Sequence, residues 1–310
     1  MTDMTVDIII PVYRPDLRLK KLIERLKRQT HPVNRIIIIN TGKEYFDSVF
    51  TGDEDFLKGV KIRHIYKEQF DHGTTRRMAA AMSDADIFIC MTDDALPLDR
   101  FLVERLVKPI EEGKAQAAYA RQLAGKNADI SEKFSRRFNY PPVSCIKSAA
   151  DLHTLGIKTF FCSNACAAYD KKTYTAAGGF EKDMIFNEDM VYARHLIDSG
   201  GSIAYVAEAR VLHSHSYTPL QQFRRNFDLG VSQAQYPDVF GGISSSSEGI
   251  RMMRGMTGYL VRRRLFRLLI PVLAGAAAKL AGYRLGKLYK KLPRLLIKAF
   301  TMNKGYWRFI

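Results

Sequence analysis

The sequence Val6-Asp-Ile-Ile-Ile-Pro-Val12 is an almost continuous apolar run, and Arg35-Ile-Ile-Ile-Ile-Asn40 repeats the pattern. Between the two runs, residues 15–29 carry apolar side chains at helical spacing. A fully apolar strand that returns after a helix is typical of a parallel sheet with both faces covered. The start of the chain therefore predicts an α/β fold with a doubly wound, mostly parallel sheet.

Later segments continue the alternation of strands and helices. Apolar runs predict strands at residues 60–66, 87–91 and 115–119, and helical periodicity predicts helices at 74–83 and 98–112. Ligands of such sheets bind beside the carboxyl ends of the strands. Three loops should therefore converge on one ligand site: residues 11–13, 40–42 and 92–94.

The pattern is weaker in the second half of the chain. Residues 126–148 form a polar stretch that suits either a loop over a site or a surface excursion. Ordered structure is expected again at 159–169, with a helix at 188–199 and a strand at 203–206. A serine run at 244–247 with neighbouring glycines is typical of a linker.

Charge divides the 310 residues unevenly. The net charge is +16, and residues 251–310 carry fifteen Lys or Arg and no Asp or Glu, so +16 less +15 leaves +1 for residues 1–250. We therefore predict a globular domain over residues 1–245 and a basic amphipathic helical region over residues 246–310.

Two interpretations of the basic region stay open. Residues 259–270 and 279–300 mix apolar residues with Lys and Arg at helical spacing. The longest uncharged run, residues 268–278, has eleven residues, fewer than the ~20 that span a bilayer. The helices could lie on an anionic membrane surface. They could also pack on the globular domain or on a second copy of the chain, as in a homo-oligomer, and both can hold.

Several classes of protein are disfavoured. The first seven residues contain two aspartates and lack the basic start and apolar core of a secretory signal, which indicates a cytoplasmic protein. Nucleic-acid binding is not expected, because the basic region has many Leu and Ile and few Tyr or Trp for stacking. No Cys-x-x-Cys pair occurs, so reduced, buried thiols are expected at Cys90, Cys145, Cys162 and Cys166.

The first candidate site is an acid pair. Asp93 and Asp94 follow the strand expected at residues 87–91, and two carboxylates at a strand end form an oxygen site suited to Mg²⁺ or Mn²⁺. The structural alternative is a capped turn before Pro97.

A second acid pair and a histidine pair follow. Glu188 and Asp189 open a predicted helix, where they could complement the helix dipole or include a general base. His213 and His215 end the last strand on one side of it and could give one nitrogen to the same cation as the first acid pair.

Taken in order, these motifs resemble an inverting family 2 glycosyltransferase of the GT-A fold over about residues 5–235. The stretches that carry the resemblance are Ile8-Ile-Ile-Pro-Val-Tyr13, Phe70-Asp-His-Gly-Thr-Thr-Arg76, Met91-Thr-Asp-Asp-Ala-Leu-Pro97, Gly178-Gly-Phe180, Asn187-Glu-Asp189 and His213-Ser-His215. The resemblance implies that residues 1–120 bind a nucleotide sugar and residues 121–245 bind the acceptor.

The resemblance also implies roles for single residues. Asp94 and His213 would bind Mn²⁺ or Mg²⁺, with His215 as the second choice, and Asp189 would be the catalytic base beside Glu188. Residues implied in binding the nucleotide sugar are Pro11, Val12, Tyr13, Asn40, Asp71, Arg76 and Asp93. Residues implied in contacts with the acceptor are Gly179, Phe180 and Arg224.

One departure from the family's Asp-x-Asp motif concerns the metal. The first acid would fall at Thr92, which leaves the cation with fewer carboxylates than usual.

A closer resemblance is to bacterial rhamnosyltransferases of cell-wall and O-antigen synthesis. It rests on Phe70-Asp-His-Gly73, Thr92-Asp-Asp-Ala-Leu-Pro97, His213-Ser-His215 and Gln222-Phe-Arg-Arg225. It implies dTDP-rhamnose as donor, with a UDP-hexose as the alternative, and a lipid-linked saccharide acceptor. The enzyme would then lie peripherally on the inner face of the cell membrane. A non-catalytic membrane adaptor is the other alternative, and the intact acids and histidine argue against it.

Overall fold

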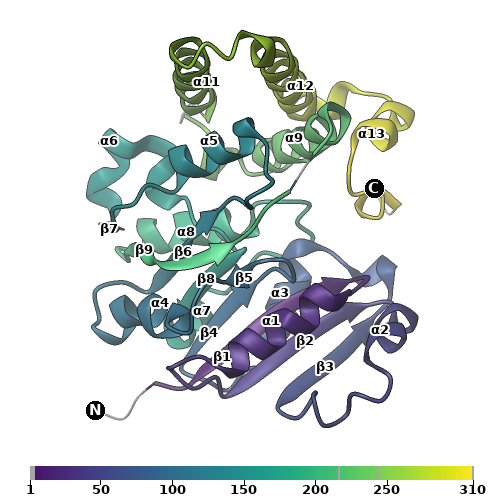
Figure 1. The fold of residues 1–310 in the computed structure, drawn as a ribbon, viewed down its shortest axis with the longest axis vertical. Coiled ribbons are helices and arrows are strands. Elements are labelled where there is room, and N and C mark those ends of the chain that lie inside the picture. Colours follow the sequence, from purple (N-terminus) through teal and green to yellow (C-terminus); the bar gives the residue numbers. More distant parts are fainter. Residues whose placement is uncertain (1–3, 216, 243–244, 309–310) are drawn as a thin grey trace.

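The computed structural model describes residues 4–215, 217–242 and 245–308. Its strands are β1 (Val6–Tyr13), β2 (Arg35–Thr41), β3 (Val60–Ile65), β4 (Ile87–Met91), β5 (Leu96–Pro97), β6 (Ala117–Leu123), β7 (Cys145–Lys147), β8 (Cys166–Asp170) and β9 (Ile203–Leu212). Within the described ranges they form one sheet in the order β3-β2-β1-β4-β8-β6-β9-β5, with β7 paired to β9 (Figure 1).

The α-helices surround this sheet and continue beyond it. They are α1 (Leu17–Lys27), α2 (Lys43–Phe50), α3 (His72–Ala81), α4 (Leu102–Glu111), α5 (Ile130–Asn139), α6 (Leu152–Leu155), α7 (Lys171–Ala176), α8 (Glu188–Asp198), α9 (Pro219–Gln235), α10 (Pro237–Phe240), α11 (Ser245–Arg262), α12 (Leu269–Lys287) and α13 (Arg294–Phe300).

The α/β class predicted from the sequence is confirmed, and the strand directions refine it. Strands β3, β2, β1 and β4 are parallel, as their apolar sequences indicate. Strand β8 runs antiparallel between β4 and β6, so the second half of the sheet is mixed. Composition does not reveal this reversal, because the direction of pairing is set by how distant strands assemble.

Alternation along the strands explains why they are apolar throughout. Ile8 and Ile10 pack in a core with Leu22 of α1. Ile9 points to the other face and packs in a core with Phe180 and Tyr192. Because successive side chains of a strand point to opposite faces, a strand with helices on both sides needs apolar residues at every position.

Several local predictions need correction. Residues 126–148 contain α5 and β7, so the segment is structured, and α5 lies over the cleft described below. The ordered structure expected at 159–169 consists of the end of a 3₁₀ helix at residues 156–160 and the start of β8 at Cys166. The serine and glycine segment was expected to be a linker. Residues 243–244 lie outside the described part, whereas Ser245 to Gly249 belong to helix α11.

Helix α12 is bound tightly to the globular domain. A methyl group added to Gly286 would lie 2.1 Å from the carbonyl oxygen of Phe227, and one on Gly282 would lie 2.2 Å from that of Phe223. On the α9 side, Gly230 is equally close to the backbone of α12. The two helices therefore touch backbone to backbone, a contact that requires glycine, as in small-residue helix pairs. The glycine face of α12 therefore packs on the globular domain, which is one of the two interpretations of the basic region.

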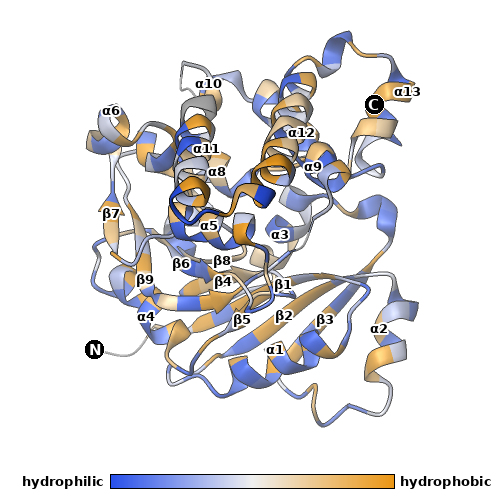
Figure 2. Cartoon of the chain, turned by 45° about the horizontal axis from the view of Figure 1, so that its top comes forward, coloured by the Kyte–Doolittle hydropathy of each residue, from blue (hydrophilic) through white to orange (hydrophobic). Residues whose placement is uncertain are grey.

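The same region also meets simple criteria for a membrane span. Phe266–Lys287 is 22 residues long and apolar enough to cross a bilayer by length and composition. This segment is longer than the uncharged run of residues 268–278, because it includes several charged residues. Figure 2 shows apolar residues along α12 above the sheet. Buried helices of soluble proteins meet the same criteria, so length and composition do not place α12 in a membrane.

The glycine contact predicts a position-dependent effect on stability. Gly286→Ala should lower the free energy of unfolding by about 1–3 kcal/mol, because the methyl group would overlap the backbone of α9. Gly275→Ala in the same helix meets no atom within 4 Å and should be neutral or stabilising. Denaturant unfolding of both variants measures the difference. Equal effects at the two positions would contradict the proposed contact.

Candidate active site

A carboxylate and two imidazoles converge beyond the ends of β4 and β9. Asp94 Oδ1 lies 3.4 Å from His213 Nε2, and Asp94 Oδ2 lies 3.3 Å from His215 Nε2. The two Nε2 atoms are 2.7 Å apart. Sheet pairing explains the convergence, because Leu96 of β5 pairs with Leu212 of β9 and so brings the loop before it beside the histidines.

This group fits a divalent cation. One ligand atom from each of Asp94, His213 and His215 lies within 4.8 Å of the others. A carboxylate oxygen and neutral imidazole nitrogens suit Mn²⁺ and related ions. Two imidazole nitrogens that face each other at close range need a proton or a cation between them. His215, the second choice from the sequence, thus joins His213 in the group.

Residues behind His213 set its tautomer. The Oε1 atom of Gln122 can only accept, so the Nδ1 atom of His213, 2.7 Å away, donates to it. Arg136 donates to the same Gln122 oxygen. Burial lowers the pKa of His213, with Asp94 opposing the shift, so the ring is neutral at physiological pH. The Nε2 lone pair is then directed at the cation position, the usual arrangement behind a metal-binding histidine.

Asp93 lies in a different environment from Asp94. Burial, and then the charge of Asp94, raise the pKa of Asp93 to about 7, while Arg18 opposes the shift. Arg18 belongs to α1 and also interacts with Asp94. A cation at this edge of the sheet reduces repulsion between the two acids. The sequence analysis did not identify Arg18, because a charged residue on an amphipathic helix is usually a solvent-exposed one.

Asp189 is held at the start of α8. Its Oδ2 atom accepts the backbone N–H of Asn164 at 2.9 Å, and its Oδ1 atom accepts that of Met190 at 2.8 Å. Burial, and then the neighbouring charge of Glu188, raise the pKa of Asp189 to about 7. A carboxyl group that ionises near neutrality suits a general base.

Glu188 has the opposite electrostatic environment. Its Oε1 atom lies 2.9 Å from an Arg76 guanidinium nitrogen and accepts a hydrogen bond from Asn164 at 3.0 Å. Burial raises the pKa of Glu188, but the charge of Arg76, the nearby His72 and the hydrogen bond from Asn164 together outweigh burial, and the net shift is downward. The expectation that Arg76 binds the diphosphate is corrected here, because its buried guanidinium faces the acid pair.

Other expected contacts also need correction. Phe180 is fully buried among Tyr169, Tyr174 and Tyr192, so it packs in the core and does not contact an acceptor. Gly179 has φ +74° and packs against the ring of Tyr174, so it forms the turn that inserts Phe180.

Arg224 and Asp71 also have structural contacts. Arg224 donates to the carbonyl of Ala299 and anchors α13, whereas its neighbour Arg225 lines the cleft described below. Asp71 accepts the backbone N–H of Thr74 at 2.7 Å and caps α3.

The expected nucleotide-binding residues lie at the ends of β1 and β2. Val12 is buried in the core, whereas Tyr13 is 42% exposed beside Tyr45. Pro11 is half-buried. Asn40 is fully buried and donates to the carbonyl of Gly42. Buried oxygens without a hydrogen-bond partner among the described residues lie at the ends of β2 and β4: Asn40 Oδ1, Thr41 Oγ1 and Thr92 Oγ1. Unsatisfied acceptors and an exposed aromatic ring suit a nucleotide.

A cleft of about 350 Å³ joins the two chemical groups. Asp189, His213 and His215 all line it. Cationic side chains enter it from three different helices: Arg136 of α5, Arg225 of α9 and Lys279 of α12. The sequence did not identify these three, because they lie in segments far apart along the chain, and only the fold gathers them.

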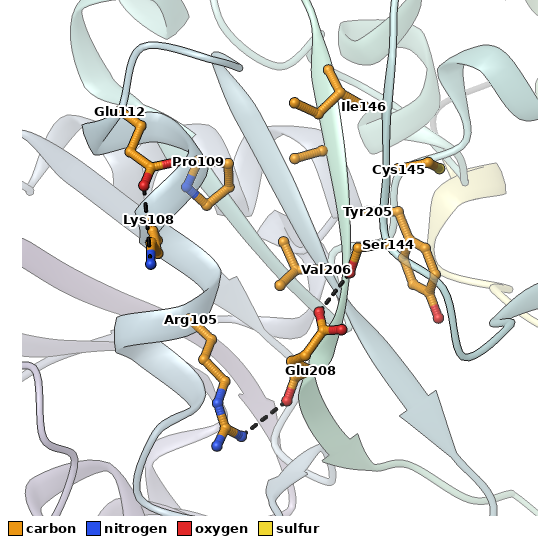
Figure 3. A pocket seen from close by; sticks show the side chains of 11 residues that line it. Arg105, Lys108, Pro109, Glu112, Ser144, Cys145, Ile146, Tyr205, Val206 and Glu208 are labelled. Carbon is orange, nitrogen blue, oxygen red and sulfur yellow. Dashed lines mark hydrogen bonds and ion pairs between the residues drawn. The ribbon is translucent and has the colours of Figure 1, made fainter.

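A second hollow, between α4 and the strands β7 and β9, has a different character (Figure 3). Its charged side chains pair locally: Lys108 with Glu112, Arg105 with the carbonyl of Glu208, and Ser144 with the Glu208 carboxylate. The candidate active site is therefore the cleft with the acid and histidine groups.

Comparison with known sequences agrees with this geometry. The family model for glycosyl transferase family 2 matches residues 7–176. The O-antigen chain rhamnosyltransferase RfbN of Salmonella typhimurium is 36% identical over 312 residues, which cover 99% of this chain and 97% of the relative. The O-antigen chain rhamnosyltransferase WbaN of Salmonella anatum is 35% identical, with 98% and 96% covered.

Solved structures confirm the GT-A type of fold. The mannosyltransferase PcManGT from Pyrobaculum calidifontis, solved with GDP-Man and Mn²⁺, has a TM-score of 0.63 at 11% identity and covers 93% of this chain and 88% of its own. S. aureus TarS with UDP-GlcNAc has a TM-score of 0.53 at 11% identity, with 93% and 92% covered.

The histidine and acid group predicts a measurable metal affinity. Asp94→Asn and His213→Gln should each weaken Mn²⁺ binding about tenfold or more, because each removes a ligand from the group. Electron paramagnetic resonance of free Mn²⁺ measures the binding. His153→Gln, an exposed histidine outside the cleft, is the matched control and should bind as the parent does. Unchanged affinity in both site variants would contradict the assignment.

Proposed function

The chain belongs to glycosyl transferase family 2, and from this premise we propose that it transfers L-rhamnose from dTDP-rhamnose to a lipid-linked saccharide during synthesis of a bacterial surface polysaccharide. The choice of sugar is supported by two relatives named as O-antigen chain rhamnosyltransferases that align over nearly their whole length. The observation that carries the proposal is that Asp189 lines the same cleft as His213 and His215, the two histidines that converge with Asp94.

In the proposed reaction, Asp189 accepts the proton of the acceptor hydroxyl. The hydroxyl oxygen then forms a bond to the anomeric carbon of the sugar from the face opposite the leaving group. The bond from that carbon to the diphosphate oxygen breaks, and its electron pair leaves with the nucleoside diphosphate. A single displacement of this kind inverts the anomeric carbon, and it needs one base and one site that neutralises the leaving group.

The two acids of α8 have separate tasks in this scheme. The positive charge of Arg76 stabilises the carboxylate of Glu188. Glu188 therefore stays ionised and accepts the hydrogen bond from Asn164. Asn164 in turn donates its backbone N–H to Asp189 and fixes the carboxylate that would act as base. Glu188 is thus a positioning residue, and Asp189 is the residue that would meet the acceptor.

The other end of the cleft would receive the leaving group. A divalent cation on Asp94, His213 and His215, with Mn²⁺ or Mg²⁺ as the proposed ion, would neutralise the charge that develops on the diphosphate. Gln122 and Arg136 keep His213 in the required tautomer. Arg18 lies close enough to Asp93 and Asp94 to add positive charge at the same edge of the sheet.

Asp189→Asn tests the base. Rhamnose transfer from dTDP-rhamnose should fall by about 100-fold or more, because no group remains to take the proton. In the unmodified enzyme, kcat/KM should rise as Asp189 ionises and level off above a pH of about 7. Near-native turnover of Asp189→Asn, or no transfer with dTDP-rhamnose while a UDP-hexose is used, would contradict the proposal.

Stability separates loss of chemistry from loss of fold. The folded pKa of Asp189 is raised, so the stability linked to its protonated form is complete below its unfolded pKa and is lost as pH rises through about 7. Asparagine cannot ionise. At pH 8 the inactive variant should therefore be at least as stable as the parent. The exposed Asp238→Asn is the control and should keep full activity.

For the location of the enzyme, we propose the cytoplasmic membrane surface. Large apolar side chains stand outward on the basic region, among them Phe266, Ile270 and Leu295, which are 56%, 79% and 83% exposed. Fifteen cations accompany them after residue 250. Exposed apolar residues among cations suit an anionic bilayer surface.

The double variant Ile270→Ser and Leu295→Ser tests this location without removing α12, which the globular domain needs for packing. Co-sedimentation with anionic vesicles should fall clearly, because apolar insertion is lost while charge is kept. High salt should release the parent only in part, since salt screens charge and not apolar contact. Complete release by salt, or unchanged binding of the variant, would contradict insertion.

A further inference from the structure

A second, apolar groove lies beside the active-site cleft. It has a volume of about 740 Å³ and is formed by α9, α11 and α12. Its apolar lining includes Leu229, Ile250, Met253, Leu273, Ala276 and Leu280. No Asp or Glu of the described residues lines it. A cavity on the order of 150 Å³ holds one benzene molecule, so this groove has room for a long hydrocarbon segment.

Helices α11 and α12, which form two sides of the groove, are each held in place by contacts with other parts of the protein. Helix α11 is held by an ion pair between Glu248 and Lys158, 2.7 Å apart, and by packing of Gly255 near Phe134 of α5. Helix α12 is held by its glycines against α9. Figure 2 shows α11 and α12 beside each other, with α9 next to α12. The groove between them is a product of the fold and does not require a partner to form.

The groove and the active-site cleft adjoin each other. Lys279 lines both of them. On α9, Arg225 lines the cleft, whereas the next residue, Asn226, and Leu229, one turn further on, line the groove. At 1.5 Å per residue, Arg225 and Leu229 lie ~6 Å apart along the helix axis. A molecule with a polar head in the cleft and an apolar chain attached to it would therefore fit both at once.

The junction carries two cations that form no ion pair with a carboxylate among the described residues. Lys279 also makes no hydrogen bond there, and the guanidinium of Arg225 lies 4.6 Å from the ring centre of Phe186. Burial lowers the pKa of Lys279, and Asp129 opposes the shift. A desolvated cation is unfavourable until an anion reaches it. A phosphate group at this point would neutralise both side chains.

We propose that the groove binds the hydrocarbon chain of a lipid-linked saccharide acceptor, and that Lys279 and Arg225 bind the phosphate that joins chain to saccharide. The inference rests on the proposed glycosyl transfer and adds the means by which this acceptor is selected. The acceptor's own chain is the occupant that the geometry favours, because the groove shares Lys279 with the cleft that would hold the saccharide.

The first test compares binding of two phosphates that differ in chain length. Long-chain polyisoprenyl phosphate in detergent should raise the melting temperature of the full-length protein clearly more than isopentenyl phosphate does, because only the long chain fills the groove. This measurement needs no turnover. Equal shifts with both phosphates would overturn the groove assignment, whatever the result of the transfer assay.

The second test fills the groove. A side chain at Gly258 meets no atom within 4 Å, so Gly258→Phe should fold and occupy part of the groove. With one saccharide attached either to the long chain or to a methyl group, the parent should prefer the long-chain acceptor by about tenfold or more in kcat/KM, as burial of several methylenes allows. Gly258→Phe should bring this preference close to unity.

The matched control is Gly275→Phe in the facing helix. Gly275 also has open space around it and lies outside the groove lining. This variant should keep the parent's preference for the long chain. If both phenylalanine variants lose the preference, contact with the detergent or bilayer surface explains it, and the groove proposal fails. If Gly258→Phe keeps it, the proposal fails as well.

Lys279→Met separates the phosphate from the chain. The KM for the long-chain acceptor should rise while the KM for dTDP-rhamnose stays unchanged, and the polyisoprenyl phosphate should stabilise this variant less. A rise in the donor KM alone would assign Lys279 to the donor diphosphate and overturn its role here. Absence of transfer to either acceptor by the parent, with intact binding of the polyisoprenyl phosphate, would instead count against the proposed function.

Discussion

The buried ion pair between Arg76 and Glu188 is the interaction on which the geometry of the site depends. Its atoms lie 2.9 Å apart, and each side chain is 6% exposed. It joins α3, which lies between the parallel strands β3 and β4 in the chain, to α8, which belongs to the second half of the domain. Loss of either partner would leave a buried charge unpaired, at a cost of about 3–5 kcal/mol. Both halves are therefore held in one register around the cleft.

The same pair explains how two adjacent acids acquire different chemistry. Arg76 lies against Glu188, and Asp189 receives only backbone N–H groups, from Asn164 and Met190. The charge on Glu188 then repels a second charge on Asp189 and raises its pKa. Neighbouring carboxyls with divergent pKa values are what acid and base chemistry at neutral pH requires. One arginine serves both acids, since it stabilises one charge and leaves the other available for a proton.

The sequence predicted the features that depend on local pattern. Apolar runs located β1, β2 and β4, because strands buried on both faces cannot contain many polar residues. Motif order located Asp94, His213 and Asp189. It could not predict that β5 pairs with β9, although this pairing brings Asp94 to the histidines. Pairs distant along the chain leave no periodic trace in one sequence.

The errors have the same origin. A helix turns by about 100° per residue, so Arg224 and Arg225 point in different directions, and only contacts with α13 and with the cleft decide which one faces the site. Arg76 reads as a phosphate ligand when its partner Glu188, over a hundred positions away, is unknown. Phe180 reads as a surface aromatic until its three tyrosine neighbours are seen around it.

The basic region shows why charge alone does not choose between a membrane surface and packing on the globular domain. Its sequence suits both, and Gly282 and Gly286 press α12 against the backbone of α9. Four residues of spacing place both glycines on one face of the helix. This contact fixes the rotation of α12, and the rotation directs Lys279 into the cleft while Ile270 remains outside. A helix that outwardly suits a membrane surface thus also completes the wall of the active site.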